Sequence, residues 1–221
     1  MRDRPSAVGE TSKTPPSPKA FFSFSYEEDK HRVDAIYQEW KARHPNVILD
    51  CLDSMVAEPV KALGEAEVKR AIRDGVDQTR VTCVLVGAHT WENRWVRYEI
   101  ARSLERGNGL LAVRINGIAD PKTGQTTVSG WNPLAYVGIG KVKGGNYLLY
   151  ENLNGQWTRY QDHPVIMSKP TYLPDMSVGY VQPLSVGLRE YDYVAQHGAE
   201  HLPDWIAKAA ASKCSGATEA S

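Results

Sequence analysis

Cysteine is scarce in this chain. Its 221 residues include three cysteines, Cys51, Cys83 and Cys214, and an odd, sparse set provides no disulfide framework. No Cys-x-x-Cys pair or Cys/His cluster has the spacing of a zinc site, so we expect no metal. Cys83 lies in an apolar run and is best interpreted as a buried structural thiol. Such cysteine usage favours the cytoplasm as the compartment.

Long apolar runs and an excess of one charge are also missing. No segment approaches the roughly 20 apolar residues of a membrane-spanning helix. Lys plus Arg and Asp plus Glu number 26 each, so the formal net charge is zero. Proteins whose main partner is nucleic acid usually carry a basic excess or stripe. We therefore expect neither a membrane nor a nucleic acid as partner.

Two phosphate-binding fingerprints are absent as well. The sequence has no Gly-rich loop of the Walker type, and no Gly-x-Gly-x-x-Gly follows the first predicted strand. These loops bring backbone N–H groups close to phosphates. A dinucleotide held as a redox cofactor is therefore not expected.

The composition that remains is that of one ordinary globular domain. The chain is 42% hydrophobic and 24% charged, which is typical of a soluble fold. The Pro- and Ser-rich residues 1–18 predict a disordered leader, residues 19–213 a single domain, and residues 214–221 a frayed tail. Within the domain we expect a core at 19–116, a loop and hairpin elaboration at 117–198, and a terminal helix at 200–213.

Strands and helices alternate through the core. Apolar runs predict strands at Ala20–Ser25, Val47–Leu49, Arg80–Val86 and Gly109–Asn116. Helical periodicity lies between them, up to a helix at 93–106 that ends at Gly107. Such alternation predicts an α/β fold, with a central parallel sheet and helices on both faces. Ligands on such sheets bind beyond the carboxyl ends of the strands.

The rhythm changes after the fourth predicted strand. Residues 117–145 are rich in Gly, Pro, Thr and Asn and predict a long loop. Asn146–Tyr160 predicts a β-hairpin with Asn154-Gly155 as its turn. Residues 164–196 are loop-like with weak strand character. A last helix is expected to start near Pro203, since proline favours the first helical turn.

The stretch most informative about chemistry is VLVGAHTWENRWVRYEIARSL, at 84–104. A buried strand leads through a polar loop into a helix, where Trp95 and Glu99 are spaced i, i+4 and share a face. A flat aromatic beside one carboxylate suits a nucleotide. In the alternative, Trp95 packs in the core and Glu99 is solvated, paired with Arg102 or Arg106. The spacing alone leaves both interpretations open.

Three stretches in order resemble a known family. They are KAFFSFSYEEDKHRV at 19–33, VLVGAHTWENRWVRYEI at 84–100 and GLLAVRINGIADPKTG at 109–124, and WNPL at 131–134 fits as well. From Lys19 to about Pro133 the chain resembles the TIR-like proteins of the Thoeris anti-phage defence family. The combination is specific, although each piece alone is not.

That resemblance implies a flavodoxin-like TIR fold and NAD+ as a substrate that is consumed, with no further cofactor. The family's catalytic glutamate falls on Glu99, and its preceding aromatic falls on Trp95. Family members release nicotinamide and form cyclic ADP-ribose isomers, or related conjugates, that activate a separate effector protein. The family also implies a trigger, such as a phage component, and a homo-oligomer is a further option.

Softer candidates follow the first two predicted strands. Phe24, Ser25 and Tyr26 are expected to face the cleft and bind substrate. In the alternative, Phe24 is a core residue and Ser25 caps a helix. Asp50 and Asp53 lie beyond the second predicted strand, where they would touch a ribose or simply be solvated.

Other candidates lie next to the Glu99 helix. His89, in the loop before it, is a further substrate-binding candidate, although a lone loop histidine is more often solvated. Arg94 and Arg97 would meet a pyrophosphate or be exposed helix charges. The chain departs from receptor-type TIR domains, whose assembly loop reads Arg-Asp-x-x-Pro-Gly, because CLDSMVAEPVKAL stands there. That departure disfavours an adaptor role.

Three functions are compatible with these features. The first is an NAD+-cleaving cyclase or transferase that depends on Glu99. The second is a non-enzymatic TIR-like scaffold, and an open cleft at Glu99 would favour the enzyme over it. The third is a nucleoside-processing enzyme of the deoxyribosyltransferase kind, which would act on free nucleosides rather than NAD+.

Overall fold

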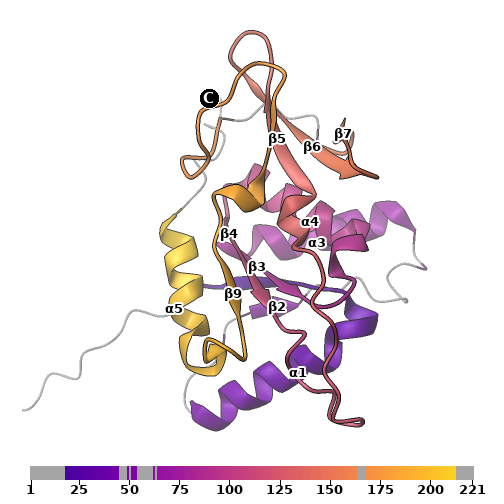
Figure 1. Ribbon diagram of the computed structural model, residues 1–221, viewed down its shortest axis with the longest axis vertical. Helices are drawn as coiled ribbons and strands as arrows, with labels where there is room; N and C mark the ends of the chain where they lie inside the picture. Colours follow the sequence, from indigo (N-terminus) through magenta and orange to yellow (C-terminus); the bar gives the residue numbers. More distant parts are fainter. Residues whose placement is uncertain are drawn as a thin grey trace, which may run out of the picture.

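The computed structural model describes residues 18–44, 49, 51–53, 62, 64–163 and 168–212. In these ranges the chain forms two sheets, a central one and a smaller one above it in Figure 1. The predicted leader (except residue 18) and the predicted tail lie outside the described residues. No helix in the described part of the chain has both the length and the apolar character needed to cross a membrane.

The central sheet has five strands, all parallel, in the order β2-β1-β3-β4-β9. The strands are β1 Ala20–Ser23, β2 Cys51–Asp53, β3 Val81–Val86, β4 Gly109–Arg114 and β9 Glu190–Asp192. When β9 is counted as the fifth strand, this order is that of the flavodoxin-like fold. The predicted α/β class and parallel sheet are confirmed.

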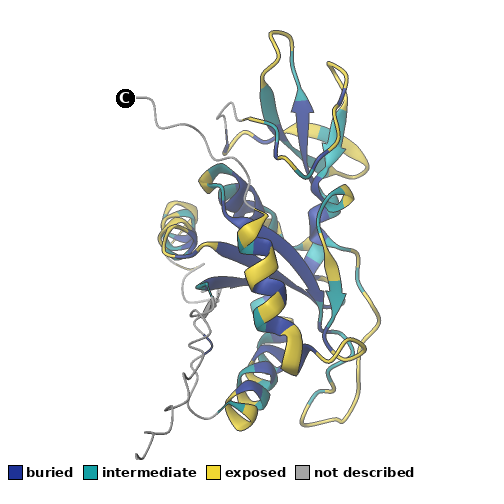
Figure 2. Ribbon diagram, turned by 90° about the vertical axis from the view of Figure 1, so that its left-hand side faces the viewer, coloured by how far each residue is buried: buried dark blue, intermediate teal, exposed yellow. Residues whose placement is uncertain are grey.

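Helices cover both faces of this sheet, as predicted. They are α1 Tyr26–Arg43, α3 Glu65–Asp77, α4 Arg94–Arg106 and α5 Gly198–Ala211. Successive strand residues point to opposite faces, so Phe22 packs with Ile36 of α1 while Phe21 packs with Ile72 of α3. Figure 2 shows the strands as the buried layer, with exposed residues on the outer sides of the helices. This layering places α4 directly on the sheet.

Local signals set both ends of α4. The Asn93 side chain accepts a hydrogen bond from the backbone N–H of Trp95 at 2.9 Å, which makes it an N-cap. Gly107 ends the helix in the left-handed region, at φ 76°, where glycine has no steric penalty. The predicted helix at 93–106 is therefore confirmed.

The second sheet is inserted between β4 and β9. It is antiparallel, in the order β7-β6-β5-β8, with strands β5 Val137–Lys141, β6 Tyr147–Leu153, β7 Gln156–Arg159 and β8 Val181–Pro183. Its apolar side packs on α4, where Ile139 and Leu149 join Val96 and Ile100 in one buried cluster. The predicted hairpin is confirmed: Asn154 and Gly155 both have positive φ, which a two-residue type I′ turn requires.

Residues 117–145 are not the uninterrupted loop that we predicted. They contain a short 3-10 helix, η2 (Pro133–Ala135), and the central strand β5. Gly138 and Gly140 suggested a loop, but both lie in β5, where neighbouring side chains leave no room for a Cβ atom. A Cβ on Gly138 would stand 2.9 Å from Val181, and one on Gly140 would stand 2.6 Å from Tyr150. Glycine there lets neighbouring side chains cross the strand.

Two strand predictions also need correction. The second strand is Cys51–Asp53, because the pairing with β1 starts at Cys51. Of the predicted run Val47–Leu49, only Leu49 is described, and it packs in the core ahead of the strand. Residues 164–196 contain β8 and the edge strand β9, for which the sequence predicted only weak strand character. The three residues of β9 show no clear pattern. Its Tyr191 stacks on Trp205 of α5 at 4.3 Å between ring centroids.

The start of the last helix was also predicted wrongly. The helix α5 begins at Gly198, so Pro203 lies in its second turn and not its first. Proline has no N–H to donate to the carbonyl four residues earlier, so the helix lacks that hydrogen bond. The left-handed His197 forms the N-cap position, at φ 52°.

The packing of the second sheet on α4 predicts unequal effects for two leucines of β6. Leu149 is 0% exposed and Leu153 is 39% exposed. We expect Leu149→Ala to lower the free energy of unfolding by about 2–5 kcal/mol, because it removes buried contacts and leaves a cavity. The control Leu153→Ala should cost less than about 1 kcal/mol. Chemical denaturation measures both, and equal losses would contradict the packing described.

Candidate active site

Glu99 is buried against the carboxyl end of β1. Its side chain is 0% exposed, and its Oε2 accepts a hydrogen bond of 2.5 Å from the hydroxyl of Ser23. Ser23 is the last residue of β1 and is equally buried. The acid therefore lies at the edge of the sheet where ligands of such folds bind.

Strand alternation explains why Ser23 makes this contact. Phe22 and Phe24 point toward α1 and belong to the core cluster there, whereas Phe21 packs against α3. Ser23 shares the face of Phe21, the face that α4 covers. We predicted site residues after this strand, and Ser23 was not among them. The period of two along β1 was the signal that could have identified it.

The solvated alternative for Glu99 is wrong. Arg102 binds Asp77 through two contacts of 2.8 Å, and Arg106 lies 3.9 Å from the same carboxylate. Glu99 faces the sheet instead of these arginines. A buried carboxylate needs hydrogen-bond donors to offset the loss of water, and Ser23 supplies one.

Trp95 lies one turn before Glu99, at the border of the buried cluster that α3 forms with Phe21 and Tyr98. It is partly buried there, and its ring meets Tyr98 edge to face at 6.2 Å. The guanidinium of Arg94 stands 4.4 Å from the centre of the Trp95 ring, and it also binds Glu65 at 3.0 Å. The Trp95 ring thus packs against the core, and the Arg94 cation stacks on it. Substrate binding by Trp95 stays a prediction.

The residues after β1 are placed in several environments. Phe24 is a buried core residue whose ring stacks on that of Tyr26 at 6.0 Å. Ser25 is the N-cap residue of α1, but its side chain makes no capping hydrogen bond. Its carbonyl accepts a hydrogen bond from the backbone N–H of Asp29. Substrate contacts by Phe24, Ser25 and Tyr26 stay predictions.

The acidic candidates of the second strand have different outcomes. Asp53 is the last residue of β2 and pairs with Phe22 of β1, so it lies within the strand and not beyond it as predicted. Its pairing with β1 places the strand further along the chain than the sequence predicted. Asp50 lies outside the described residues. Ribose binding by either residue stays a prediction.

His89 and Arg97 both interact with the chain itself. His89 is exposed, and its Nδ1 lies 3.1 Å from Glu92 Oε1. The hydrogen bond that the imidazole donates to Glu92 raises the pKa of His89 above its usual value, with a further contribution from the charge of Glu28. Arg97 donates to the carbonyls of Trp91 and Glu92 at 3.1 and 3.2 Å. A pyrophosphate contact by Arg97 stays a prediction.

A buried ion pair, Asp29 with Arg32, was not predicted. The two side chains are 1% and 4% exposed, and Arg32 Nη1 lies 2.9 Å from Asp29 Oδ1. Burial raises the pKa of Asp29, while the charge and hydrogen bond of Arg32 oppose that rise. The i, i+3 spacing in a first helical turn is usual for surface pairs, so the sequence held no signal of its burial.

A second polar cluster joins Arg114, the last residue of β4, to Glu190, the first residue of β9. Arg114 binds Glu190 and donates to the carbonyl of Gly130 at 2.9 Å. The side-chain amide of Asn132 donates to Glu190 at 2.7 Å. These contacts hold the segment before η2 along the edge of the sheet, with Trp131 68% exposed.

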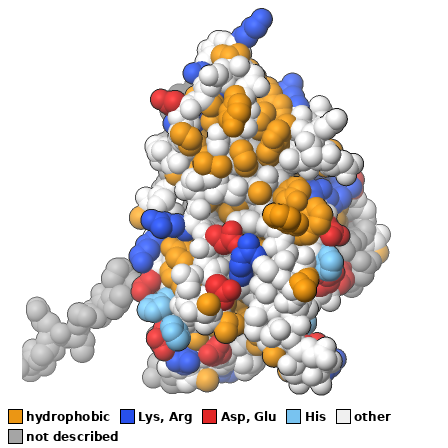
Figure 3. Space-filling model, in the orientation of Figure 1, with side chains coloured by type: hydrophobic (Ala, Val, Ile, Leu, Met, Phe, Trp, Pro, Cys, Tyr) orange, Lys and Arg blue, Asp and Glu red, His pale blue; other side chains and the backbone are white. Residues whose placement is uncertain are grey.

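The surface around these elements has mixed charge. Figure 3 shows acidic and basic side chains interspersed over the lower half of the molecule, and apolar side chains gathered over the upper part, where Figure 1 places the second sheet. The described residues hold no group of three or more His, Cys, Asp or Glu side chains placed to bind a metal ion.

The open cleft that would favour an enzyme over a scaffold is not present at Glu99, whose side chain is fully covered. A cavity of about 600 Å³ lies nearby, lined by Trp91, Tyr136 and the β6–β7 turn, but Glu99 is not among its lining residues. The geometry therefore provides an oriented, covered carboxylate. Similarity to known proteins has to distinguish an enzyme from a scaffold.

Residues 21–120 match the family described as Thoeris protein ThsB, TIR-like domain. A protein of Bacillus cereus (strain MSX-D12) named "Putative cyclic ADP-D-ribose synthase ThsB1" is 34% identical over 191 residues, which cover 85% of this chain and 98% of that protein. The chain belongs to the Thoeris ThsB family. The resemblance found in the sequence is thereby confirmed. Ser23, Asp29 and Glu99 all lie inside the segment that matches the ThsB domain.

The contact between His89 and Glu92 predicts a shift that can be measured. Because a carboxylate stabilises the charged imidazole, the pKa of His89 should lie above the usual value of about 6.5. We expect Glu92→Gln to lower it, as followed by NMR titration of the imidazole protons. Glu67→Gln, at a partly exposed residue paired with Arg70, should leave it unchanged. An unchanged pKa of His89 in Glu92→Gln would contradict the contact.

Proposed function

We propose that this ThsB-family protein cleaves the bond between nicotinamide and ribose in NAD+ and forms a cyclic ADP-ribose messenger or a related conjugate. The observation that carries the proposal is the buried Glu99 carboxylate, held by Ser23 at the carboxyl end of β1. The name of the Bacillus cereus relative supports the class of product.

One carboxylate is enough for this chemistry. Nicotinamide in NAD+ is a cationic leaving group and needs no general acid, unlike the leaving oxygen of an ordinary glycoside, for which a second carboxyl group is required. Its departure leaves positive charge on the ribose. A fixed carboxylate beside that ribose stabilises the charge as it develops. Glu99 is the residue that we assign to this role.

The surroundings of Glu99 strengthen that effect. Electrostatic interactions are larger where water is excluded, and the Ser23 hydroxyl fixes the orientation of the carboxylate. Because the carboxylate is covered, substrate entry requires side chains around α4 to move. Trp95 borders the same helix face and is our candidate for stacking on a substrate ring.

The product depends on what attacks the ribose next. Water would give ADP-ribose, whereas the substrate's own adenine or a ribose hydroxyl would give a ring. A site that keeps water out favours the second outcome. As further parts of the proposal, the product activates a separate effector in the cytoplasm, and a phage component or self-association controls the enzyme.

The first test measures nicotinamide release from NAD+ by purified protein, with products resolved by mass spectrometry. We expect wild type to release nicotinamide and Glu99→Gln to lose at least about 100-fold of that rate, because the substitution keeps the shape and removes the charge. Equal release by both proteins would remove Glu99 from the catalytic role.

A trigger can keep the purified protein silent, so the same assay is repeated in extracts of phage-infected cells that express it. If nicotinamide release is absent there too, the scaffold function replaces the enzyme. Cleavage of free nucleosides without cleavage of NAD+ would instead indicate the deoxyribosyltransferase type.

Ser23 provides a second test. Ser23→Ala removes a hydrogen bond to a charged group, so we expect nicotinamide release to fall by about 10- to 100-fold. The control is Ser103→Ala, because the Ser103 hydroxyl binds the backbone carbonyl of Glu99 and not its carboxylate. Its rate should stay within about threefold of wild type. Equal losses in the two variants would show a general packing effect.

A further inference from the structure

We propose that the buried Asp29–Arg32 pair and Thr90 form a positioning cluster that keeps water from the ribose and so sets the ratio of cyclic to linear product. The inference rests on the proposed function. None of these three residues touches substrate in this account. They act by holding together the segments that lead from Ser23 into α1 and from β3 into the helix of Glu99.

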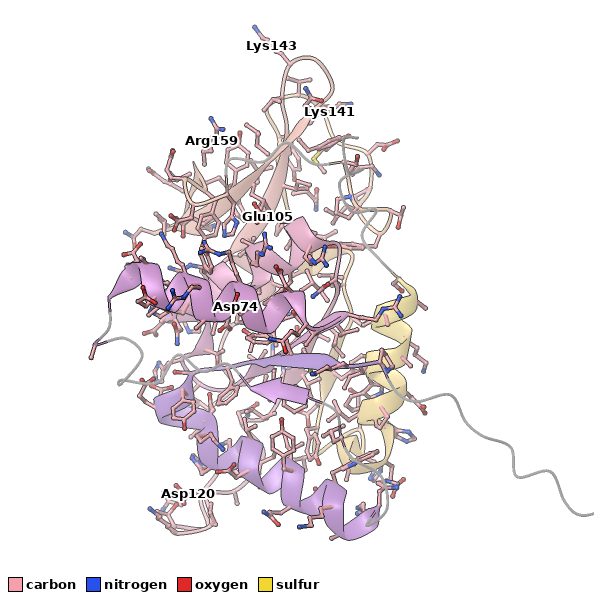
Figure 4. The ribbon with its side chains drawn as sticks, turned by 180° about the vertical axis from the view of Figure 1, so that it is seen from behind. Asp74, Glu105, Asp120, Lys141, Lys143 and Arg159 are labelled. Carbon is pink, nitrogen blue, oxygen red and sulfur yellow. The ribbon has the colours of Figure 1, made fainter. Side chains whose placement is uncertain are left out.

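The cluster joins three loops at the carboxyl edge of the sheet. Asp29 and Arg32 belong to the first turns of α1, which follows β1. Arg32 Nε donates to the carbonyl of Ile118 at 3.1 Å, in the loop after β4. Figure 4 shows Asp120, two residues further along that loop, beside α1, where it lies 3.8 Å from His31. The loops after β1 and β4 are thus held by one side chain.

Thr90 brings in the loop after β3. Its hydroxyl donates to Asp29 Oδ2 at 3.3 Å and accepts from the backbone N–H of Gly87 at 2.8 Å. Thr90 is fully buried. A Cβ on Gly87 would collide with the carboxylate of Asp29, so the carboxylate rests directly on the backbone at the end of β3. The cluster therefore contacts the start of α1, the loop after β3 and the loop after β4.

This cluster is connected to Glu99 from both sides. Thr90 starts the 3-10 helix η1 (Thr90–Glu92), and Asn93, the N-cap of α4, follows at once. On the other side, Ser23 and the start of α1 are separated by two residues. A change in the closure of these loops therefore shifts the Glu99 helix relative to its Ser23 partner.

The consequence for the reaction follows from competition between nucleophiles. The bond from ribose C1′ to the nicotinamide nitrogen breaks, and its electron pair leaves with neutral nicotinamide. A lone pair on adenine, on a ribose hydroxyl or on water then forms the new bond to C1′. Attack by a hydroxyl or by water releases that oxygen's proton to solvent, whereas attack by an adenine ring nitrogen transfers the positive charge to the adenine. If these loops are held less tightly, water reaches the ribose more often. The share of linear ADP-ribose in the product therefore rises.

Thr90 offers a matched pair of variants. Thr90→Val keeps the shape and removes the hydroxyl, whereas Thr90→Ser keeps the hydroxyl. The Asp29–Arg32 pair remains in both. We expect Thr90→Val to lower the ratio of cyclic to linear ADP-ribose by about 2- to 10-fold, the range of one hydrogen bond. Thr90→Ser should stay close to wild type.

Two readouts separate this role from general stability. If Thr90→Val lowers nicotinamide release but leaves the product ratio unchanged, the positioning role is overturned. Hydrogen exchange provides a readout that needs no activity: amides at 87–92 and 115–118 should exchange at least about threefold faster in Thr90→Val than in Thr90→Ser. Equal exchange in the two variants would also overturn it.

The outcomes also separate this inference from the proposed function. If wild type releases no nicotinamide in purified form or in infected extracts, the proposed function fails, and the exchange rates alone decide whether the cluster joins the loops. If wild type makes both products and the two Thr90 variants match it, the proposed function stands and the inference fails.

Discussion

The hydrogen bond from Ser23 to Glu99 is the contact on which the site depends. It joins the first strand to the helix after the third strand, across 76 residues of sequence. A carboxylate in this position loses its water and must gain donors in exchange. The parallel sheet makes the contact possible, because β1 and β3 pair directly and end at the same edge. The other features of the site either hold this edge together or cover it.

The cover has two layers. The nearer one is the Asp29, Arg32 and Thr90 cluster, which ties together the loops after β1, β3 and β4. The outer one is the inserted antiparallel sheet, which packs on α4 and lies between β4 and β9, where a flavodoxin-like fold has the helix that joins its fourth and fifth strands. The inserted sheet packs on α4, and Thr90 of the cluster starts the 3-10 helix that leads into α4. A ThsB-type enzyme that must cyclise its substrate would gain from such enclosure, because water is the competing nucleophile.

Sequence patterns were enough for the parallel core, since β1, β3, α4 and β4 each carry a strong apolar period and clear ends. They failed where tertiary contacts override local signals. Gly138 and Gly140 suggest a loop until Val181 and Tyr150 are placed across them. Within the site, spacing and family resemblance indicated Glu99. Ser23 and the buried Asp29–Arg32 pair depend on contacts between distant segments, which no local pattern encodes.

The most direct test of this account is a crystal structure of Glu99→Gln with NAD+ bound. We predict that the nicotinamide ribose will lie within hydrogen-bond distance of the side chain at position 99, with Ser23 still in contact with it and the loops after β1, β3 and β4 around the ligand. NAD+ bound elsewhere, for example in the cavity beside Trp91 and Tyr136, with the side chain at position 99 still covered, would contradict the central claim.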